Sequence, residues 1–189
     1  MQTHSMLEKT PDEAHLYEAA IRHLARYAAT EMGLARILAR RIERWGRKQA
    51  ASPENQADEI AHILQQAKEK IPAVLSRLKA QGVLNDEAFS ASRVRQLALS
   101  GKSRRATLAY LAAKGVLAPE LPNNPDRELA AACFYIRRRR AGPFGNAPYA
   151  KILAAMARGG FSQRTAQQAL DLSLEEAELL IQSISSILS

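Results

Sequence analysis

The side chains best able to do chemistry in this sequence are cations, and they gather at three places. These are Lys102, Arg104 and Arg105; the run Arg137 to Arg140; and a basic stripe formed by Arg36, Arg40, Arg44 and Arg47. Clustered cations bind phosphate groups or acidic protein surfaces. A net charge of +8 and a pI of about 9.9 favour the same kind of polyanionic partner.

The run Arg137 to Arg140 has two interpretations. Consecutive helical residues lie about 100° apart, so four of them surround about three quarters of a helix and cannot all be buried. Repulsion between Arg137 and Arg140, partly offset by the dipole at a helix C-terminus, favours contact with phosphate or an acidic partner. The alternative is a solvated helix end in which one or two arginines pair with Glu128 or another nearby acid.

The other two clusters also keep two interpretations each. Lys102, Arg104 and Arg105 stand at an expected helix start, where the helix dipole disfavours exposed cations by up to about 1 kcal/mol each. Either a bound anion compensates for that cost, or these are ordinary solvated charges. The basic stripe recurs about once per helical turn, which suits a phosphate backbone, an acidic groove or a solvated helix face.

Arrangements that would support catalysis or metal binding are missing from the sequence. The four histidines are scattered and no cysteine lies near any of them, so the spacing of metal ligands is not met. Several pairs of neighbouring acids fall at expected helix starts, where capping and the dipole explain them. Gly101-Lys102-Ser103 resembles the end of a P-loop, but Gln96 stands where that pattern needs glycine. The sequence therefore predicts no enzyme activity, no metal and no cofactor.

Composition indicates a helical protein. Apolar residues make up 47% of the 189 residues and aromatic residues only 5%, so the core must rely on small and aliphatic side chains. The alternation typical of strands is almost absent.

The single Cys133 excludes an internal disulfide and is expected to be buried, and Trp45 is expected in the core rather than as a stacking platform for bases. Neither a signal peptide nor a membrane-spanning run is recognisable, so a soluble cytoplasmic protein is expected.

The segment from Gly82 to Val116 predicts two antiparallel helices. The residues expected to begin and end them are Asn85 or Asp86, Gly101, Ser103 and Gly115. The residues expected to face inward are Ala91, Val94, Leu97 and Ala98 on the first helix and Leu108, Leu111 and Ala112 on the second.

The rest of the chain predicts further helices. Their expected ranges are 11–28, 31–48, 56–81, 125–140, 148–158, 162–170 and a last segment from 173 onward. Thr10 is expected to cap the first helix with Pro11 at its first position, and Pro72 is expected to kink or divide the third. The segment 116–125, with three prolines, is the best candidate for a hinge or linker.

Several motifs in this chain occur together, in order, in one known family. Gly82 to Val116 carries the opening L-[ND]-D-x-x-[FY]-[AS], a basic GKSRR elbow and the ending L-x-x-L-x-x-K-G-V. RRRRAGPF, from Arg137 to Phe144, and LAAMARGGFS, from Leu153 to Ser162, follow. In these motifs the chain resembles the RecX family, regulators of the RecA recombinase, over roughly Leu16 to Leu170.

The resemblance implies an all-α fold in which three tandem three-helix modules form an elongated, curved array. The expected division is a flexible tail 1–11, a first module 12–82, a second module 83–122, a third module 123–172 and a C-terminal helical tail 173–189. A weak internal repeat supports it, since LAYLAAKGV (Leu108 to Val116) aligns with LAAMARGGF (Leu153 to Phe161).

The resemblance also implies a function. A RecX-like protein is expected to bind within the groove of the RecA filament and to inhibit recombinase, ATPase and co-protease activity in DNA repair and the SOS response. The expected partners are the RecA filament, single-stranded DNA and duplex DNA, without a membrane, and a monomer is expected. The expected contact residues are Lys102, Arg104, Arg105, Arg137, Arg138, Arg139, Arg140, Arg36, Arg40 and Arg44. Two alternatives stay open: a direct nucleic-acid-binding helical module, and an architectural helical adaptor.

Overall fold

The computed structural model describes residues 10–51, 56–116 and 121–188. These ranges contain no strand. Their α-helices, and the 3-10 helix η1, are in chain order α1 (Glu13–Leu24), α2 (Glu31–Ala50), α3 (Ala57–Glu69), α4 (Ile71–Ala80), α5 (Asp86–Leu99), α6 (Arg104–Ala113), α7 (Pro125–Arg138), η1 (Gly142–Phe144), α8 (Tyr149–Arg158), α9 (Gln163–Asp171) and α10 (Leu174–Leu188). The predicted all-α class is confirmed. Residues 1–9 of the expected tail and 117–120 of the expected linker lie outside the described ranges.

The chain divides into two compact units. Unit 1 is Met1–Phe89 and unit 2 is Ser90–Ser189, so the division falls within α5. Each unit has its own cluster of buried apolar residues. The arrangement of three repeated modules in an elongated array, and its boundaries near residues 82 and 122, stay predictions. No helix in the described ranges combines the length and apolar character needed to cross a bilayer.

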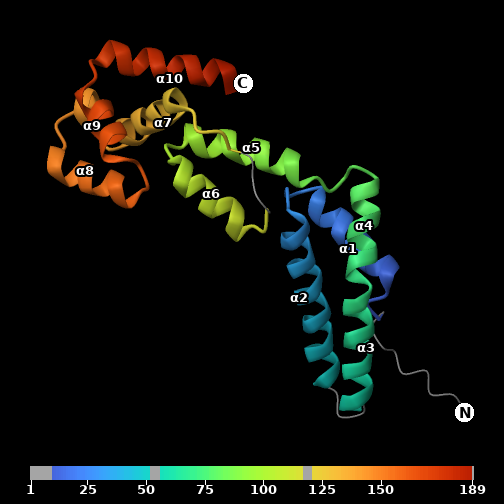
Figure 1. The fold of residues 1–189 in the computed structure, drawn as a ribbon. Helices are drawn as coiled ribbons and strands as arrows, with labels where there is room; N and C mark the ends of the chain where they lie inside the picture. Colours follow the sequence, from blue (N-terminus) through green and yellow to red (C-terminus); the bar gives the residue numbers. More distant parts are fainter. Residues whose placement is uncertain (1–9, 52–55, 117–120, 189) are drawn as a thin grey trace, which may run out of the picture. The chain divides into compact units, whose positions relative to one another are not determined.

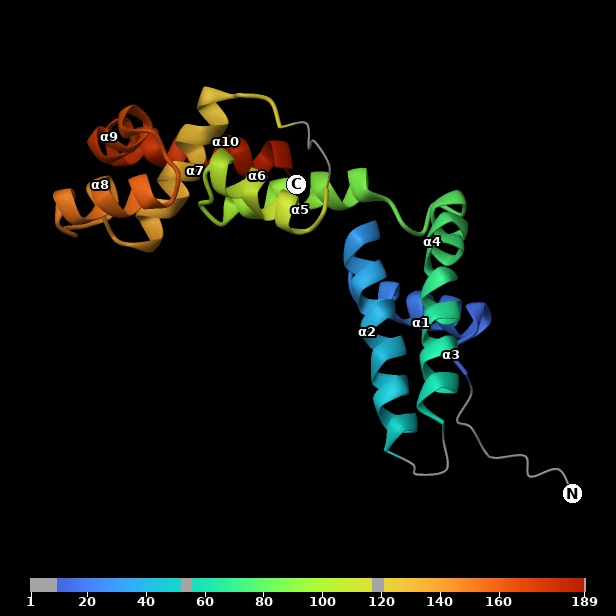
Figure 2. The same ribbon diagram turned by 60° about the horizontal axis from the view of Figure 1, so that its bottom comes forward.

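Unit 1 is built around α2. This helix lies beside α3 and contacts α4, and α1 packs against α4 (Figures 1 and 2). The buried apolar residues of this core are Leu16, Ala20, Leu34, Leu38, Ile42, Ala67, Ile71, Val74, Leu75, Leu78 and Leu84. Gly46 allows close approach of α2 to α3, because a Cβ there would lie 2.8 Å from the Leu64 side chain.

Two local signals in unit 1 had different outcomes. Pro72 does divide the predicted 56–81 helix: α3 ends at Glu69 and Pro72 lies in the first turn of α4, where its missing N–H costs nothing. The predicted Thr10 cap is wrong. Asp12 caps α1 instead, because its carboxylate accepts the backbone N–H of His15 at 2.8 Å, and Pro11 is buried before the helix.

Unit 2 is built around α7, which packs against α9 and α10 (Figure 1). Most residues of α7 between Leu129 and Ile136 are buried, and Cys133 is fully buried as expected. Burial raises the pKa of the Cys133 thiol to about 11. The helices α8 and α9 pack against each other and complete this core with Ile152, Met156, Phe161, Ala166, Ala169 and Leu170.

The predicted helix starts in unit 2 are confirmed at several places. Ser103, Asn124 and Ser162 each accept a backbone N–H three residues further on, as N-caps do. Gly115 has the expected left-handed conformation, with φ of +85°. Two expectations about inward faces are wrong: on α5, Ala98 is buried but Ala91 is exposed, and on α6, Leu111 is buried but Ala112 is exposed.

Candidate polyanion-binding surfaces

The basic stripe lies on the side of α2 that faces away from the core of unit 1. Leu34, Leu38 and Ile42 are buried on the inner side of this helix, whereas all four arginines of the stripe are exposed. At about 100° and 1.5 Å per residue, their positions fall within an arc of about 80° and extend over about 17 Å. The stripe is therefore a straight row of cations on one exposed face.

Most guanidinium groups of the stripe have no partner among the residues that the structure describes. Arg36 contacts the Met32 sulfur at 2.9 Å, but Arg40, Arg44 and Arg47 make no hydrogen bond or ion pair within the part of the chain that the structure describes. The acids on the same helix pair with other elements: Glu43 with Lys68 at 3.2 Å and Glu31 with Lys79 at 2.7 Å. The stripe thus keeps its full charge for an external anion.

The start of α2 is fixed by polar contacts that hold the stripe in place. Thr30 accepts the backbone N–H of Gly33 at 3.0 Å, and Asp86 accepts the backbone N–H of Glu31 at 2.8 Å. Two of the free N–H groups at the helix start are thereby satisfied. Gly33 suits this cap, because a Cβ there would lie 2.9 Å from the Thr30 hydroxyl.

The second group of cations surrounds the elbow between α5 and α6. We call it the basic joint, and its members are Lys102, Arg104, Arg105 and Arg137 to Arg140. The elbow packs tightly on the rest of unit 2: Gly101 lies so close to α7 that a Cβ there would be 2.6 Å from the backbone nitrogen of Tyr135. The Ser103 hydroxyl donates to the Gly159 carbonyl at 2.7 Å. The structure therefore brings these two predicted clusters together around one packed junction.

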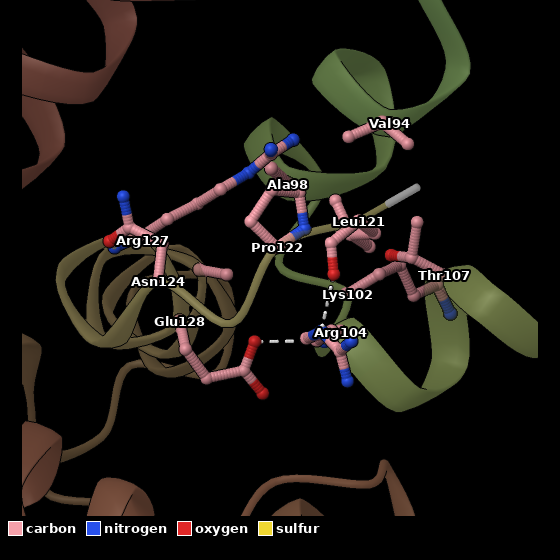
Figure 3. A pocket seen from close by; sticks show the side chains of 11 residues that line it. Val94, Ala98, Lys102, Arg104, Thr107, Leu121, Pro122, Asn124, Arg127 and Glu128 are labelled. Carbon is pink, nitrogen blue, oxygen red and sulfur yellow. Dashed lines mark hydrogen bonds between the residues drawn. The ribbon is translucent and has the colours of Figure 1, made fainter. Parts of the chain in front are cut away.

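Glu128 provides the anion that the start of α6 needs. Its carboxylate accepts the backbone N–H of Arg104 at 2.8 Å, and the Arg104 Nε donates to the Leu121 carbonyl at 2.8 Å (Figure 3). A carboxylate at a helix start offsets the cost of cations there. Burial raises the pKa of Glu128, and the hydrogen bond and the charges of Arg104 and Arg127 oppose that rise.

The alternative interpretation, in which Glu128 pairs with the arginine run, is not observed for Glu128. Glu128 lies in the first turns of α7 and the run lies at its end, so about 13 Å or more of helix separates them. The expectation that all four arginines are helical is wrong. α7 ends at Arg138, Arg139 is the C-cap, and Arg140 has a left-handed conformation with φ of +51°.

Three arginines of the run contribute to the packing of unit 2. Arg138 donates to the Ser100 carbonyl at 3.1 Å, while the guanidinium of Arg139 lies 3.7 Å from the ring centre of Tyr135. Arg137 lies 5.3 Å from the ring centre of Phe134. Arg105 adds a hydrogen bond of 3.3 Å to the Ala157 carbonyl. All four side chains remain exposed. Arg138 and Arg105 fasten the elbow to α7 and α8, whereas Arg137 and Arg139 contact rings of their own helix.

A small pocket lies between α5, α6 and α7. Figure 3 shows Val94, Ala98, Arg104, Thr107 and Glu128 around it, and its volume is about 20 Å³. That space holds about one water molecule. It is too small for a nucleotide or a cofactor. In the described ranges, no three histidine, cysteine, aspartate or glutamate residues gather as metal ligands would.

Two residues of these surfaces, Arg41 and Tyr135, were not predicted from the sequence. Arg41 is exposed beside the stripe, about 60° further around α2 than Arg44, and helical spacing would have found it. Tyr135 was missed although it contacts Gly101, Arg139 and the ring of Phe161. No local pattern marks Tyr135, because its neighbours come from distant segments.

Comparison with known proteins gives one informative similarity. The chain is similar to the "Regulatory protein RecX" of Myxococcus xanthus (strain DK1622), with 32% identity over 169 residues that cover 83% of this chain and 84% of the relative. No protein-family model matches the sequence, and no solved structure matches it. Identity of this extent along most of both chains is a mark of common family membership.

Proposed function

Because the chain belongs to the RecX family of regulatory proteins, we propose that it binds RecA filaments on single-stranded DNA and restrains their activity. The motifs of the elbow, the arginine run and α8 are those by which the chain resembles regulators of RecA. Bound protein slows ATP hydrolysis, strand exchange and co-protease activity in DNA repair and the SOS response. The regulator acts as a cytoplasmic monomer, and catalysis is not part of its role.

The basic stripe is the observation that best supports a polyanionic partner. It presents four exposed arginines on one face of α2, three of which have no partner within the described residues. An acidic surface of a filament subunit, or the phosphates of its DNA, would meet these charges without first breaking internal ion pairs. The exposed side chains of the basic joint form a second contact surface. Weak contacts of this kind add when several occur on neighbouring filament subunits.

The first experiment measures ATP hydrolysis by RecA on single-stranded DNA while this protein is titrated at less than one copy per RecA subunit. We expect strong suppression well below equimolar ratio, because one bound regulator affects several subunits of a filament. Binding to the same DNA without RecA is measured in parallel at the same salt concentration.

Two results would contradict the proposal. Unchanged ATP hydrolysis together with salt-dependent binding to bare DNA would instead favour a direct nucleic-acid-binding module, whose affinity falls with salt at a slope set by the number of phosphate contacts. Indifference to both RecA and DNA would favour a purely architectural adaptor.

A further inference from the structure

The turn between α8 and α9 has the features of a helix-turn-helix. Residues 159–162 join the two helices. Gly160 has a left-handed conformation with φ of +92°, Phe161 is buried in the core, and Ser162 caps α9 by accepting the backbone N–H of Thr165 at 3.0 Å. A left-handed residue, a buried apolar anchor and an N-cap in this order end one helix and begin the next in a fixed direction. Figures 1 and 2 both show α8 and α9 running in different directions.

A third helix supports this pair from the inside. The buried side of α9 consists of Ala166, Ala169 and Leu170, which belong to the same core as α7. Both α7 and α8 pack against α9. Three helices packed in this way, with a turn between the last two, form the unit that places a recognition helix in the major groove of DNA.

The exposed side of α9 carries side chains able to read base edges. Its outward residues are Gln163, Arg164, Gln167 and Gln168, which are exposed or half-buried. None of them makes a hydrogen bond or an ion pair within the residues that the structure describes. Glutamine amides match the donor and acceptor pattern of adenine, and the arginine guanidinium matches that of guanine.

The dimensions and charges around α9 also fit duplex DNA. A helix of nine residues is about 14 Å long, and the major groove is about 12 Å wide. Lys151 and Arg158 are exposed on α8 beside it, where they can contact phosphates, and the only acid of α9 is Asp171 at its far end.

We propose that α9 is a recognition helix that enters the major groove of duplex DNA. The four outward residues of α9 contact base edges, and Lys151 and Arg158 hold the phosphate backbone. This activity is separate from binding to RecA filaments and gives the protein a preference for particular duplex sequences.

The elbow between α5 and α6 offers a contrast within unit 2. It has the same construction, with Gly101 left-handed at φ of +72° and Ser103 as N-cap. Beyond its first turn, however, the exposed residues of α6 include Ala109, Ala112 and Ala113, which have no groups for reading bases. Two similar elbows thus lead to helices with different outer faces: that of α9 carries amides and a guanidinium along its length, whereas that of α6 consists largely of alanine beyond its first turn.

The test uses the full-length protein and a pool of duplexes with a randomised central segment. Bound duplexes are recovered at fixed salt over several rounds and sequenced, for the natural protein and for Arg164→Ala and Gln168→Ala. Arg95→Ala on α5 and Gln182→Ala on α10 are matched controls, because both replace exposed helical residues of unit 2. Circular dichroism confirms that each variant is folded.

We expect the natural protein and both controls to enrich the same sequence. Each α9 variant should lose about 5- to 100-fold in affinity for that sequence and relax the preference at one or two positions. Unselective recovery by the natural protein, or the same enriched sequence with both α9 variants, would overturn the proposal. Loss of RecA inhibition in the α9 variants without any change in duplex selection would also overturn it, because it would place α9 against the filament instead.

Discussion

The basic stripe and the basic joint contain the same residue types at similar exposure, yet their guanidinium groups have different surroundings. In the joint, Arg138 donates to a carbonyl oxygen and Arg139 stacks on the ring of Tyr135. In the stripe, Arg40 and Arg44 contact no acid or acceptor in the described part of the chain. The sequence alone therefore does not distinguish arginines that make internal contacts from arginines that make none within the described residues.

The comparison teaches that charge density alone does not locate a binding surface. The densest run of arginines serves a packed junction, in which the cations are partly satisfied by carbonyl groups and aromatic rings. In the sparser stripe, three of the four guanidinium groups have no partner in the described ranges. We therefore expect substitutions in the joint to act mainly on stability, and those in the stripe mainly on binding.

Gly101→Ala should have the largest effect, because it disturbs the packing on which the joint depends. The new Cβ would lie 2.6 Å from the backbone nitrogen of Tyr135, at a residue with φ of +72°. Steric overlap and the left-handed conformation together should lower the free energy of unfolding by about 3 kcal/mol. Urea denaturation followed by circular dichroism measures this.

Gly82→Ala is the matched control for that change. Gly82 has a similar φ of +69°, but nothing lies within 4 Å of the Cβ position. Only the backbone cost of about 1 kcal/mol remains. Equal losses for the two variants would show that close packing of the elbow on α7 contributes nothing.

The double variant Arg138→Ala/Arg139→Ala tests the structural role of the joint directly. It removes a hydrogen bond of 3.1 Å and a ring contact of 3.7 Å, both at exposed side chains. We expect the free energy of unfolding to fall by about 1.5 kcal/mol. Arg40→Ala/Arg44→Ala, measured in the same way, should change it by less than about 0.5 kcal/mol. A loss no larger in the joint than in the stripe would contradict the distinction.

Local signals in the sequence predicted most helix boundaries. Ser103, Asn124 and Ser162 cap helices, and Pro72 begins one, because each acts on backbone groups within a few residues of itself. The error at Thr10 is also local, because Asp12, two residues later, is the N-cap and its carboxylate accepts the backbone N–H of His15.

Contacts between distant segments could not be predicted in this way. Glu128 was one alternative partner for the arginine run, but its carboxylate instead accepts the backbone N–H of Arg104, which lies 24 residues away in the sequence. The end of α7 inside the run depends on Ala141, which is buried, and on Gly142, which packs against Leu170. Which arginines are satisfied internally follows from this packing and not from their spacing.

Removing two cations from the stripe should weaken binding to RecA filaments while leaving the fold intact. Arg40→Ala/Arg44→Ala should raise the concentration needed for half-maximal suppression of RecA ATP hydrolysis by about fivefold, as expected for two exposed charge contacts. Arg22→Ala/Arg26→Ala removes the same charge from other exposed positions of unit 1 and should have little effect. Equal effects of the two double variants would mean that net charge, and not the stripe, attracts the filament.

The smallest expected effect is on the acid dependence of the melting temperature, to which one carboxylate at a helix start contributes in each unit. The backbone N–H and side chain of His15 lower the pKa of Asp12 below 3.8 in unit 1, and the backbone N–H and hydroxyl of Ser173 lower the pKa of Glu176 below 4.5 in unit 2. A folded-state pKa below the unfolded value adds stability that is present above the unfolded pKa and lost as pH falls through the folded one. The melting temperature should therefore fall as the solution is acidified below about pH 4.5.

Asp12→Asn and Glu176→Gln keep an acceptor but cannot titrate, so each should flatten the acid dependence of its own unit only. An acid profile that neither variant changes would show that other carboxylates control it.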